Sequence, residues 1–326
     1  MTKMIETTAT DNGTFIAQGP EQYVELTKNM GKGTFKHLFE SAHINAINTA
    51  IACQRPLLIT GDPGVGKTQL ARAAAKMLDR AFVRYTVDAK TESRDLLWQF
   101  DAVARLADAQ LAQSLKWNEA TCEKKLAPQN YLRPGPFWWG FNWKQAESQP
   151  RAAAPVQRDR GDYKNGVVVL IDEVDKAEID VPNGLLEALG DASFQPDGFS
   201  VAVRVSGVPP LIVITTNRER GLPDAFVRRC VLLKMELPKE EQALRILLVG
   251  RGKAHTRLEN PILEEAADLF IKDRKQAKDD KLRYLPGQAE YLDLLRAIEE
   301  LSGNGYSHDK LLAMVSPYVL RKGDAL

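Results

Sequence analysis

Residues 56–68 read PLLITGDPGVGKT, an apolar run followed directly by the pattern G-x-x-x-x-G-K-T. In such a loop glycines let successive backbone N–H groups point into one concave cradle, and the N-terminus of the next helix adds a partial positive charge. The apolar run predicts a buried strand, and Gln69–Leu78 has the pattern of an amphipathic helix. This context predicts a loop that binds nucleotide phosphates, formed by Gly61, Asp62, Pro63, Gly64, Val65, Gly66, Lys67, Thr68 and Gln69.

Two side chains of this loop have distinct expected roles. Lys67 is expected to reach the terminal phosphates of ATP, and Thr68 to place its hydroxyl on Mg²⁺. The alternative is a glycine-rich turn that contains a lysine by chance. The complete pattern, standing between a strand and a helix, favours the nucleotide-binding interpretation.

Two adjacent carboxylates follow the apolar run 167–171, which reads VVVLI. Carboxylates at the end of a buried strand are costly unless a cation or water meets them, and a magnesium-bound nucleotide supplies that partner. We expect Asp172 to act on the metal and Glu173 to polarise the attacking water as general base. An ordinary acidic turn that runs into solvent is the alternative.

Two further signals follow the apolar run 211–215. Asn217 could hold the attacking water in line beside the γ-phosphate, or it could only cap a turn. Arg228 and Arg229 stand directly before the next strand-like run, where an arginine could stabilise the phosphoryl transition state of a neighbouring subunit. Two ordinary surface arginines are the alternative for this pair.

Five short apolar runs predict buried parallel strands with helices between them, which is the pattern of an α/β sheet covered on both faces. The expected strands are 56–60, 82–87, 167–172, 211–215 and 231–235. After Pro238 only helical patterns follow.

The chain is therefore expected to divide into three parts. Residues 1–34 form a polar N-terminal arm. Residues 35–237 form a nucleotide-binding domain with a parallel five-stranded sheet sandwiched by helices, beginning with a helix over 35–52 and carrying an insertion at about 98–165. Residues 238–326 form a small all-helical lid domain.

The phosphate loop, the paired carboxylates, the asparagine and the arginine pair, in this order, resemble the AAA+ P-loop ATPases over roughly residues 35–301. Three features are similar to the MoxR-type members. DAVAR at 101–105 with RPGPF at 133–137 resembles their first inserted hairpin, parts of 187–205 resemble their second, and YLPGQAEYLDLLR at 284–296 resembles their lid helix.

This resemblance implies a homo-oligomer, a hexamer, that binds ATP with Mg²⁺ at the seam between subunits. It also implies that hydrolysis moves the lid and remodels a protein client, most often with a von Willebrand A-domain partner. The family usually places an arginine near the start of the lid helix, whereas this chain has Gly287, Gln288 and Ala289 there. Arg283 could serve instead, or Arg296.

We also predict the environment of two segments and of the four histidines. The aromatic stretch 131–143 is expected to pack in the interior, with contact to a partner or a pore as the alternative. The polar, arginine-rich stretch 148–162 is expected to be mobile. The histidines lie away from every motif and are expected at the surface or with satisfied partners: His37, His43, His255 and His308.

The composition narrows the class of protein. Lys and Arg number 44 against 43 Asp and Glu, which disfavours nucleic acid as the partner. No apolar run approaches the roughly 20 residues that span a bilayer, and the N-terminal residues lack the apolar core of a signal peptide. The three cysteines have neither metal-ligand nor disulfide spacing, which fits a reducing compartment. We expect a cytoplasmic protein without a membrane partner.

The motifs predict an ATP hydrolase, and the resemblance implies that it couples ATP binding and hydrolysis at subunit interfaces to remodelling or activation of a protein client. Two alternatives stay open. A nucleic-acid-dependent motor or loader would hydrolyse ATP faster with polynucleotide and would depend steeply on salt. A slow nucleotide-gated signalling switch would turn over negligibly even after assembly.

Overall fold

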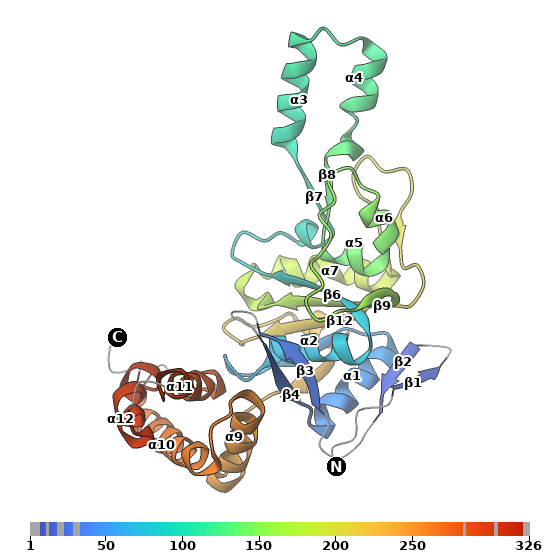
Figure 1. Cartoon of the computed structure of the whole chain (residues 1–326). Coiled ribbons are helices and arrows are strands. Elements are labelled where there is room, and N and C mark those ends of the chain that lie inside the picture. The colour runs from blue at the N-terminus through green and yellow to red at the C-terminus, as the bar shows by residue number, and fades with distance from the viewer. Residues whose placement is uncertain are drawn as a thin grey trace.

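The computed structural model of the chain describes residues 7–10, 13–17, 23–28, 33–282, 285–302 and 306–321. At its centre five parallel strands lie in the spatial order β13-β5-β12-β9-β6 (Figure 1). They are β5 (Leu57–Thr60), β6 (Arg80–Thr86), β9 (Asp162–Asp172), β12 (Leu211–Thr216) and β13 (Val231–Lys234). The predicted α/β fold with a parallel five-stranded sheet is confirmed.

Helices cover both faces of this sheet. Helices α1 (Ser41–Cys53) and α2 (Lys67–Met77) pack on one face. Helices α5 (Pro136–Phe141) and α7 (Asp180–Asp191) pack on the other. Along β5 the side chains of Leu57 and Ile59 pack in the apolar core on the α1 and α2 face, and the side chain of Leu58 packs in the core on the opposite face. A strand buried on both faces must be apolar throughout, which is why uninterrupted apolar runs marked these strands.

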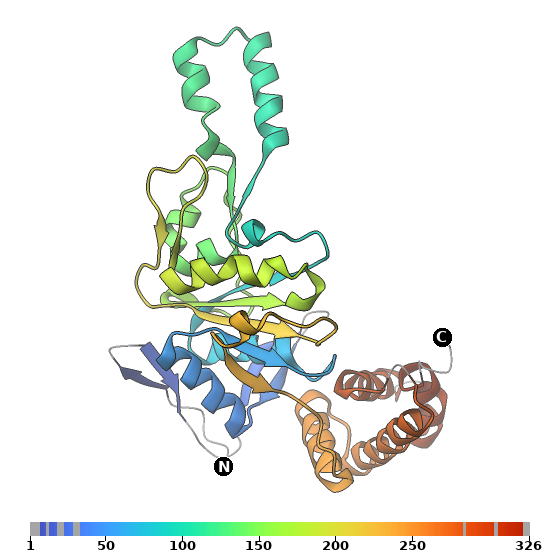
Figure 2. The same cartoon turned by 180° about the vertical axis from the view of Figure 1, so that it is seen from behind.

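The insertion is a stalk that carries a helical hairpin away from the sheet (Figures 1 and 2). Strands β7 (Trp98–Phe100) and β8 (Leu132–Pro134) pair antiparallel and lead to α3 (Ala102–Ser114) and α4 (Glu119–Lys125). Three short helices flank it: η1 (Ser93–Leu96), η2 (Pro128–Tyr131) and α6 (Trp143–Glu147).

The aromatic stretch below the stalk is part of the core, so its predicted packing role is confirmed. Phe137, Trp138, Trp139 and Phe141 are at most 3% exposed. The second hairpin pairs β10 (Ser193–Phe194) with β11 (Val203–Arg204) and packs on these residues, because the Phe194 ring lies 6.0 Å from that of Trp138 and 5.9 Å from that of Phe141.

Short antiparallel hairpins form the N-terminal region. The predicted arm, residues 1–34, contains β1 (Thr7–Thr10) paired with β2 (Gly13–Ile16), and β3 (Tyr23–Thr27), which pairs with β4 (Thr34–Leu38) at the start of the predicted nucleotide-binding domain. The predicted leading helix over 35–52 is wrong for its first residues, because α1 begins only at Ser41. Phe35 and Phe39 are spaced as a helix requires, yet buried and exposed residues alternate along β4, which is the period of a strand.

The C-terminal region is helical and has a core of its own. It consists of α9 (Glu241–His255), α10 (Asn260–Asp279), α11 (Gln288–Leu301) and α12 (His308–Val319). Within the described part of the chain, no helix has both the length and the apolarity needed to cross a membrane.

The joint between this region and the sheet domain holds three of the four histidines. His37 of β4, His43 of α1 and His255 of α9 are buried, and both ring nitrogens of His37 lack a hydrogen-bond partner among the described residues. The expectation of surface or satisfied histidines is therefore wrong for His37. Arg251 of α9 donates to the Leu38 carbonyl (3.2 Å) across the same joint.

The arginine-rich stretch expected to be mobile is instead fixed along the edge strand β6. The Gln157 carboxamide accepts from the Phe82 amide (2.7 Å) and donates to the Phe82 carbonyl (3.0 Å). Asp159 pairs with Arg72 of α2 (2.5 Å) and accepts from the Thr27 amide (2.8 Å). These contacts satisfy backbone groups that an edge strand would otherwise expose.

Candidate functional site

The predicted phosphate loop joins β5 to α2 and depends on its glycines. A Cβ atom on Gly61 would lie 1.9 Å from the Met235 carbonyl oxygen, so no larger residue fits there. Gly66 is the N-cap of α2 and has φ +97°, a left-handed conformation that favours glycine. The backbone thus makes a tight turn directly before a helix N-terminus, as a phosphate cradle requires.

Lys67, the first residue of α2, is buried and its ammonium is surrounded by oxygen acceptors. It donates to the carbonyls of Gly61 (2.6 Å) and Asp62 (2.9 Å) and to Asn217 Oδ1 (2.8 Å). Burial lowers the pKa of Lys67, while the carboxylates of Asp172 and Asp175 act in the opposite direction. The ammonium is held at the mouth of the loop by acceptors of the kind that phosphate oxygens also supply.

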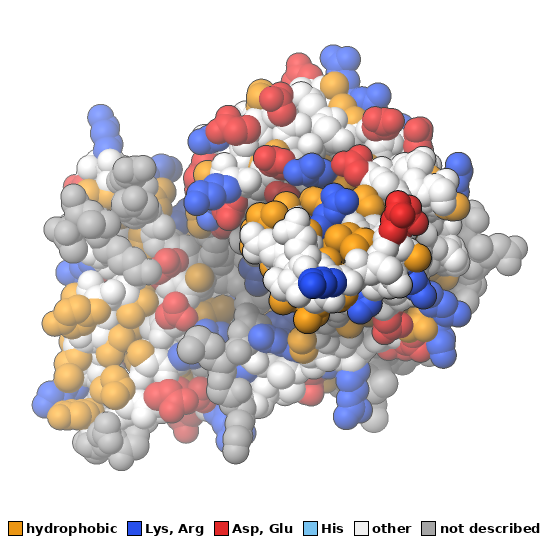
Figure 3. Space-filling model, turned by 90° about the horizontal axis from the view of Figure 1, so that it is seen from above, with side chains coloured by type: hydrophobic (Ala, Val, Ile, Leu, Met, Phe, Trp, Pro, Cys, Tyr) orange, Lys and Arg blue, Asp and Glu red, His pale blue; other side chains and the backbone are white. Residues whose placement is uncertain are grey.

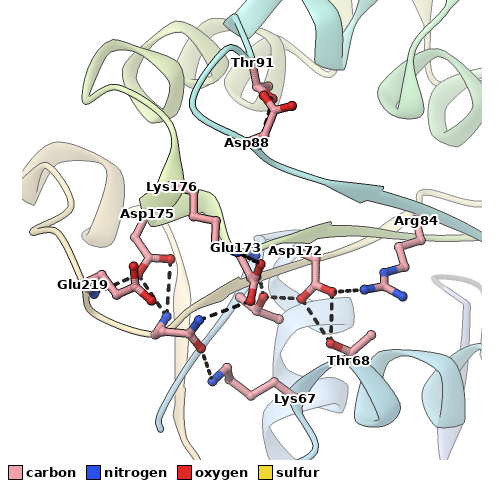
Figure 4. A network of polar contacts seen from close by, with 12 residues as sticks. Lys67, Thr68, Arg84, Asp88, Thr91, Asp172, Glu173, Asp175, Lys176 and Glu219 are labelled. Atoms are coloured by element: carbon pink, nitrogen blue, oxygen red, sulfur yellow. Dashed lines mark hydrogen bonds and ion pairs between the residues drawn. The ribbon is translucent and has the colours of Figure 1, made fainter. Parts of the chain in front are cut away.

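Thr68 and Asp172, both predicted magnesium ligands, lie together (Figure 4). Thr68 Oγ1 is 3.1 and 3.0 Å from the two oxygens of the buried Asp172 carboxylate. Thr215 Oγ1 donates to Asp172 Oδ1 (2.6 Å), and Arg84 pairs with Oδ2 (2.8 Å). A hydroxyl and a carboxylate held side by side at a phosphate loop are a donor set that suits Mg²⁺.

Glu173, the predicted base, follows β9 in a left-handed conformation with φ +61°. Its amide donates to Thr215 Oγ1 (2.9 Å), and its carboxylate contacts Asn217 Nδ2 (3.3 Å) and Lys176 Nζ (2.5 Å). The Asn217 carboxamide therefore bridges Lys67 and Glu173, since it also accepts from the lysine. The structure brings the predicted binding and catalytic groups into one connected network.

The buried Asp175 carboxylate holds the chain that follows β12. It accepts from the backbone amides of Asn217 (3.1 Å) and Glu219 (2.9 Å). Asp175 thereby fixes the position of Asn217, whose side chain faces Lys67 and Glu173. Sequence reasoning assigned no role to Arg84, which lies outside every motif, or to Thr215, which belongs to the run before Asn217 but was given no function of its own.

The other predicted residues lie apart from this network. Arg228 and Arg229 follow α8 (Asp224–Val227) and are exposed, and Arg229 donates to the Ala225 carbonyl (3.3 Å). Neither arginine forms a hydrogen bond or ion pair with the phosphate loop in the described part of the chain. Gln69 is half-buried in the first turn of α2.

Of the two arginines predicted to reach the nucleotide from the C-terminal region, only Arg296 lies among the described residues. Arg283 lies outside the described residues. Arg296 of α11 pairs with Asp293 of the same helix (3.3 Å) and not with the phosphate loop.

The start of α11 instead abuts the loop, and a different arginine reaches it. A Cβ atom on Gly64 would lie 3.0 Å from that of Ala289, and one on Gly287 would lie 3.2 Å from the Pro63 carbonyl oxygen. Arg274 of α10 lies 3.8 Å from the Asp62 carboxylate and donates to the Pro286 carbonyl. Burial lowers the pKa of Arg274 while Asp62 opposes that shift. No motif marks this arginine in the sequence.

The chain is similar to a known protein family and to solved structures. A family model described as an AAA domain of the dynein-related subfamily matches residues 56–230, more than half of the 326 residues. Two solved structures align over most of the chain at 15% sequence identity. A candidate ATPase from Cytophaga hutchinsonii aligns with 85% of this chain and 79% of its own length (TM-score 0.39). A mutant of RuvB from Thermotoga maritima aligns with 84% of this chain and 67% of its own (TM-score 0.46).

Proposed function

This chain belongs to the AAA domain family, dynein-related subfamily, and we propose that it hydrolyses ATP at the site built around Lys67 and Glu173. One observation carries the proposal. The Asn217 carboxamide accepts from the Lys67 ammonium (2.8 Å) and donates to the Glu173 carboxylate (3.3 Å). A group that binds phosphate and a group that can take a proton from water are thereby coupled through one amide.

Each residue of the network has a role in this proposal. The amides of residues 61–68 and the Lys67 ammonium bind the phosphates of ATP. Thr68 and Asp172 would hold Mg²⁺, which neutralises phosphate charge when bound. Glu173 accepts a proton from the attacking water, and Asn217 orients that water.

The test separates binding from chemistry. Glu173→Gln keeps the shape and the contact with Asn217 but removes the base. ATP affinity should stay within a few-fold, and the steady-state hydrolysis rate should fall by about 10²-fold or more. Glu187→Gln, an exposed acid on α7, is the matched control. Normal turnover by Glu173→Gln would contradict the proposal, and negligible turnover by the unmodified protein at every concentration would favour the slow switch.

We further propose a MoxR-like assembly, a hexamer in which Arg228 or Arg229 acts on the nucleotide of the next subunit. The exposure of both arginines and their distance from the phosphate loop along the chain support this. The packing of the α11 N-terminus on the loop supports coupling between hydrolysis and lid movement. A protein client would receive that movement, with a von Willebrand A-domain protein as partner.

The α3 helix is the region that we propose contacts the client. Seen from its tip, the protrusion exposes apolar side chains between charged ones (Figure 3). Four apolar side chains of α3 and its C-cap are more than half exposed: Val103, Leu106, Leu111 and Leu115.

This placement predicts a selective defect. Leu106→Ser with Leu111→Ser should abolish stimulation of ATP hydrolysis by a permanently unfolded protein, while the basal rate stays unchanged. Gln113→Ser on the same helix is the control. Unaltered stimulation would place client contact elsewhere, and stimulation by polynucleotide alone would favour the nucleic-acid motor.

A further inference from the structure

A basic cavity lies between α2, the edge strand β6 and the segment 155–160, on the side of the sheet that α2 covers. Its volume is about 490 Å³, which is within the range of small-molecule pockets. One carboxylate, that of Asp159, lines it. Six cationic side chains line it as well: Arg72, Lys76, Arg80, Arg84, Arg158 and Arg160.

The periods of a helix and a strand bring these cations together. Arg80, Phe82 and Arg84 alternate along β6 and line the cavity, whereas the intervening Ala81 and Val83 pack in the core on the opposite face. Arg72 and Lys76 are four residues apart and share one face of α2.

Arg80 is a buried cation that has no counter-ion among the described residues. Its side chain is only 2% exposed, one Nη donates to the Pro209 carbonyl (3.3 Å), and Nε has no partner. No carboxylate pairs with it in the described part of the chain. Burial lowers its pKa to about 10, so it still carries its charge at neutral pH. An uncompensated buried charge is costly, and a bound anion would offset that cost.

Two of the lining cations already have a carboxylate partner. Asp159 pairs with Arg72 (2.5 Å), and Arg84 pairs with Asp172 at the nucleotide site (2.8 Å). Arg158 and Arg160 are exposed at the rim. The lining thus keeps an excess of positive charge that the described residues do not neutralise.

We propose that this cavity binds a small organic phosphate. Its phosphoryl oxygens would pair with the guanidinium groups, which match phosphate geometry, and its apolar part would lie on Phe82, Pro155 and Val156. The far end of the cavity lies about 13.5 Å from the phosphate loop along α2, since Lys76 is nine residues beyond Lys67, whereas Arg84 connects the cavity to the nucleotide site through Asp172. Its small volume favours a single molecule over a nucleic-acid strand.

The test uses the full chain carrying Lys67→Ala, so that the phosphate loop does not contribute. Titration calorimetry with pyrophosphate and with ADP should detect one site for each, with ADP bound more tightly because of its apolar part. Arg80→Met should weaken both by about tenfold or more. Arg158→Gln with Arg160→Asn should do the same without disturbing the interior, since asparagine tolerates the left-handed conformation (φ +56°) of residue 160.

Arg204→Met, an exposed arginine on β11 that does not line the cavity, should leave both affinities unchanged. Absence of phosphate binding, or affinities that survive both sets of substitutions, would overturn the proposal. Equal affinities for pyrophosphate and ADP would contradict the proposal that the cavity also binds the apolar part of an organic phosphate. Tighter binding of a single-stranded oligonucleotide than of pyrophosphate, with a steep salt dependence, would assign the cavity to nucleic acid instead.

Discussion

Asn217 contacts both parts of the candidate site, and it illustrates how far sequence reasoning reaches at the scale of single residues. The carboxyl ends of parallel strands meet at one edge, so residues that follow β5, β9 and β12 could be expected to converge. The motifs therefore identified Lys67, Asp172, Glu173 and Asn217. The bridge that Asn217 makes between Lys67 and Glu173 depends on side-chain conformations that no pattern encodes.

Arg84 and Arg274 could not be found in this way. Arg84 reaches Asp172 only because β6 and β9 are neighbours in register, with Thr86 opposite Asp172. Arg274 reaches Asp62 only because α10 and α11 pack together beside the phosphate loop. Both contacts arise from tertiary packing, and arginines are common on helix and strand surfaces.

The position of Arg274 leads to a prediction about the lid. Its guanidinium is the cation of the C-terminal helical region that reaches the phosphate loop among the described residues. Arg274→Ala should lower the ATP hydrolysis rate by about tenfold or more, with Arg274→Lys intermediate, because a guanidinium that reaches the phosphate loop can stabilise the charge of the transition state. Arg296→Ala, which removes only a contact with Asp293, should leave the rate unchanged. A rate that falls with Arg296→Ala and stays unchanged with Arg274→Ala would mean that Arg296 acts on the nucleotide instead.

At the scale of elements, apolar runs correctly predicted the strands of the central sheet, whereas the alternating segment that forms β4 was wrongly predicted to be helical. A strand buried on both faces has an unmistakable composition, whereas β4 is a short hairpin strand with only one buried face. Its buried residues Phe35 and His37 pack against α9, a helix more than 200 residues later in the chain. The spacing of the apolar residues alone could not show whether this segment is a strand that packs against a distant helix or the buried face of a helix.

The packing of α9 on β4 makes stability sensitive to acid. Burial lowers the pKa of His255 to about 4, with Arg296 and Arg251 adding to the shift, and burial also lowers that of His37. Between pH 6.5 and about 4 the unfolded chain therefore binds more protons than the folded one. The free energy of unfolding should fall as pH falls through this window, by at most about 1.4 kcal/mol per pH unit for each such histidine.

The corresponding measurement is urea unfolding at pH 7 and at pH 5. His255→Phe, which keeps a ring against Phe35, should lose less stability between these two pH values than the unmodified protein. His308→Phe, a change at a partly exposed histidine, should match the unmodified protein. Equal losses for all three proteins would mean that His255 does not contribute.

At the scale of the whole molecule, three apolar cores divide the chain. Two lie on opposite faces of the sheet and the third lies within the helical region that begins after β13. Alternation of strand and helix patterns followed by helices alone was enough to predict this arrangement. The stalk and hairpin between β6 and β9 could be placed as an insertion, but their projection from the sheet depends on packing that the sequence pattern does not contain.

In our proposal a neighbouring subunit completes the site. Its phosphate loop, base and bridging amide form one network, while the exposed Arg228 and Arg229 lie outside it. The central claim is that ATP is hydrolysed in this network with an arginine supplied by the neighbouring subunit. Such an arginine contributes about 10³-fold or more to the rate where it has been studied.

Subunit mixing tests this claim most directly. One protein carries Arg228→Ala and Arg229→Ala and keeps its phosphate loop, and the other carries Lys67→Ala and keeps its arginines. Each alone should be inactive, and the mixture should regain part of the ATP hydrolysis rate, since the first protein binds ATP and the second donates the arginine. A second protein that carries all three substitutions should restore nothing. If mixed assemblies form, as measured by native mass spectrometry, and no activity returns, the claim of a site shared between subunits is contradicted.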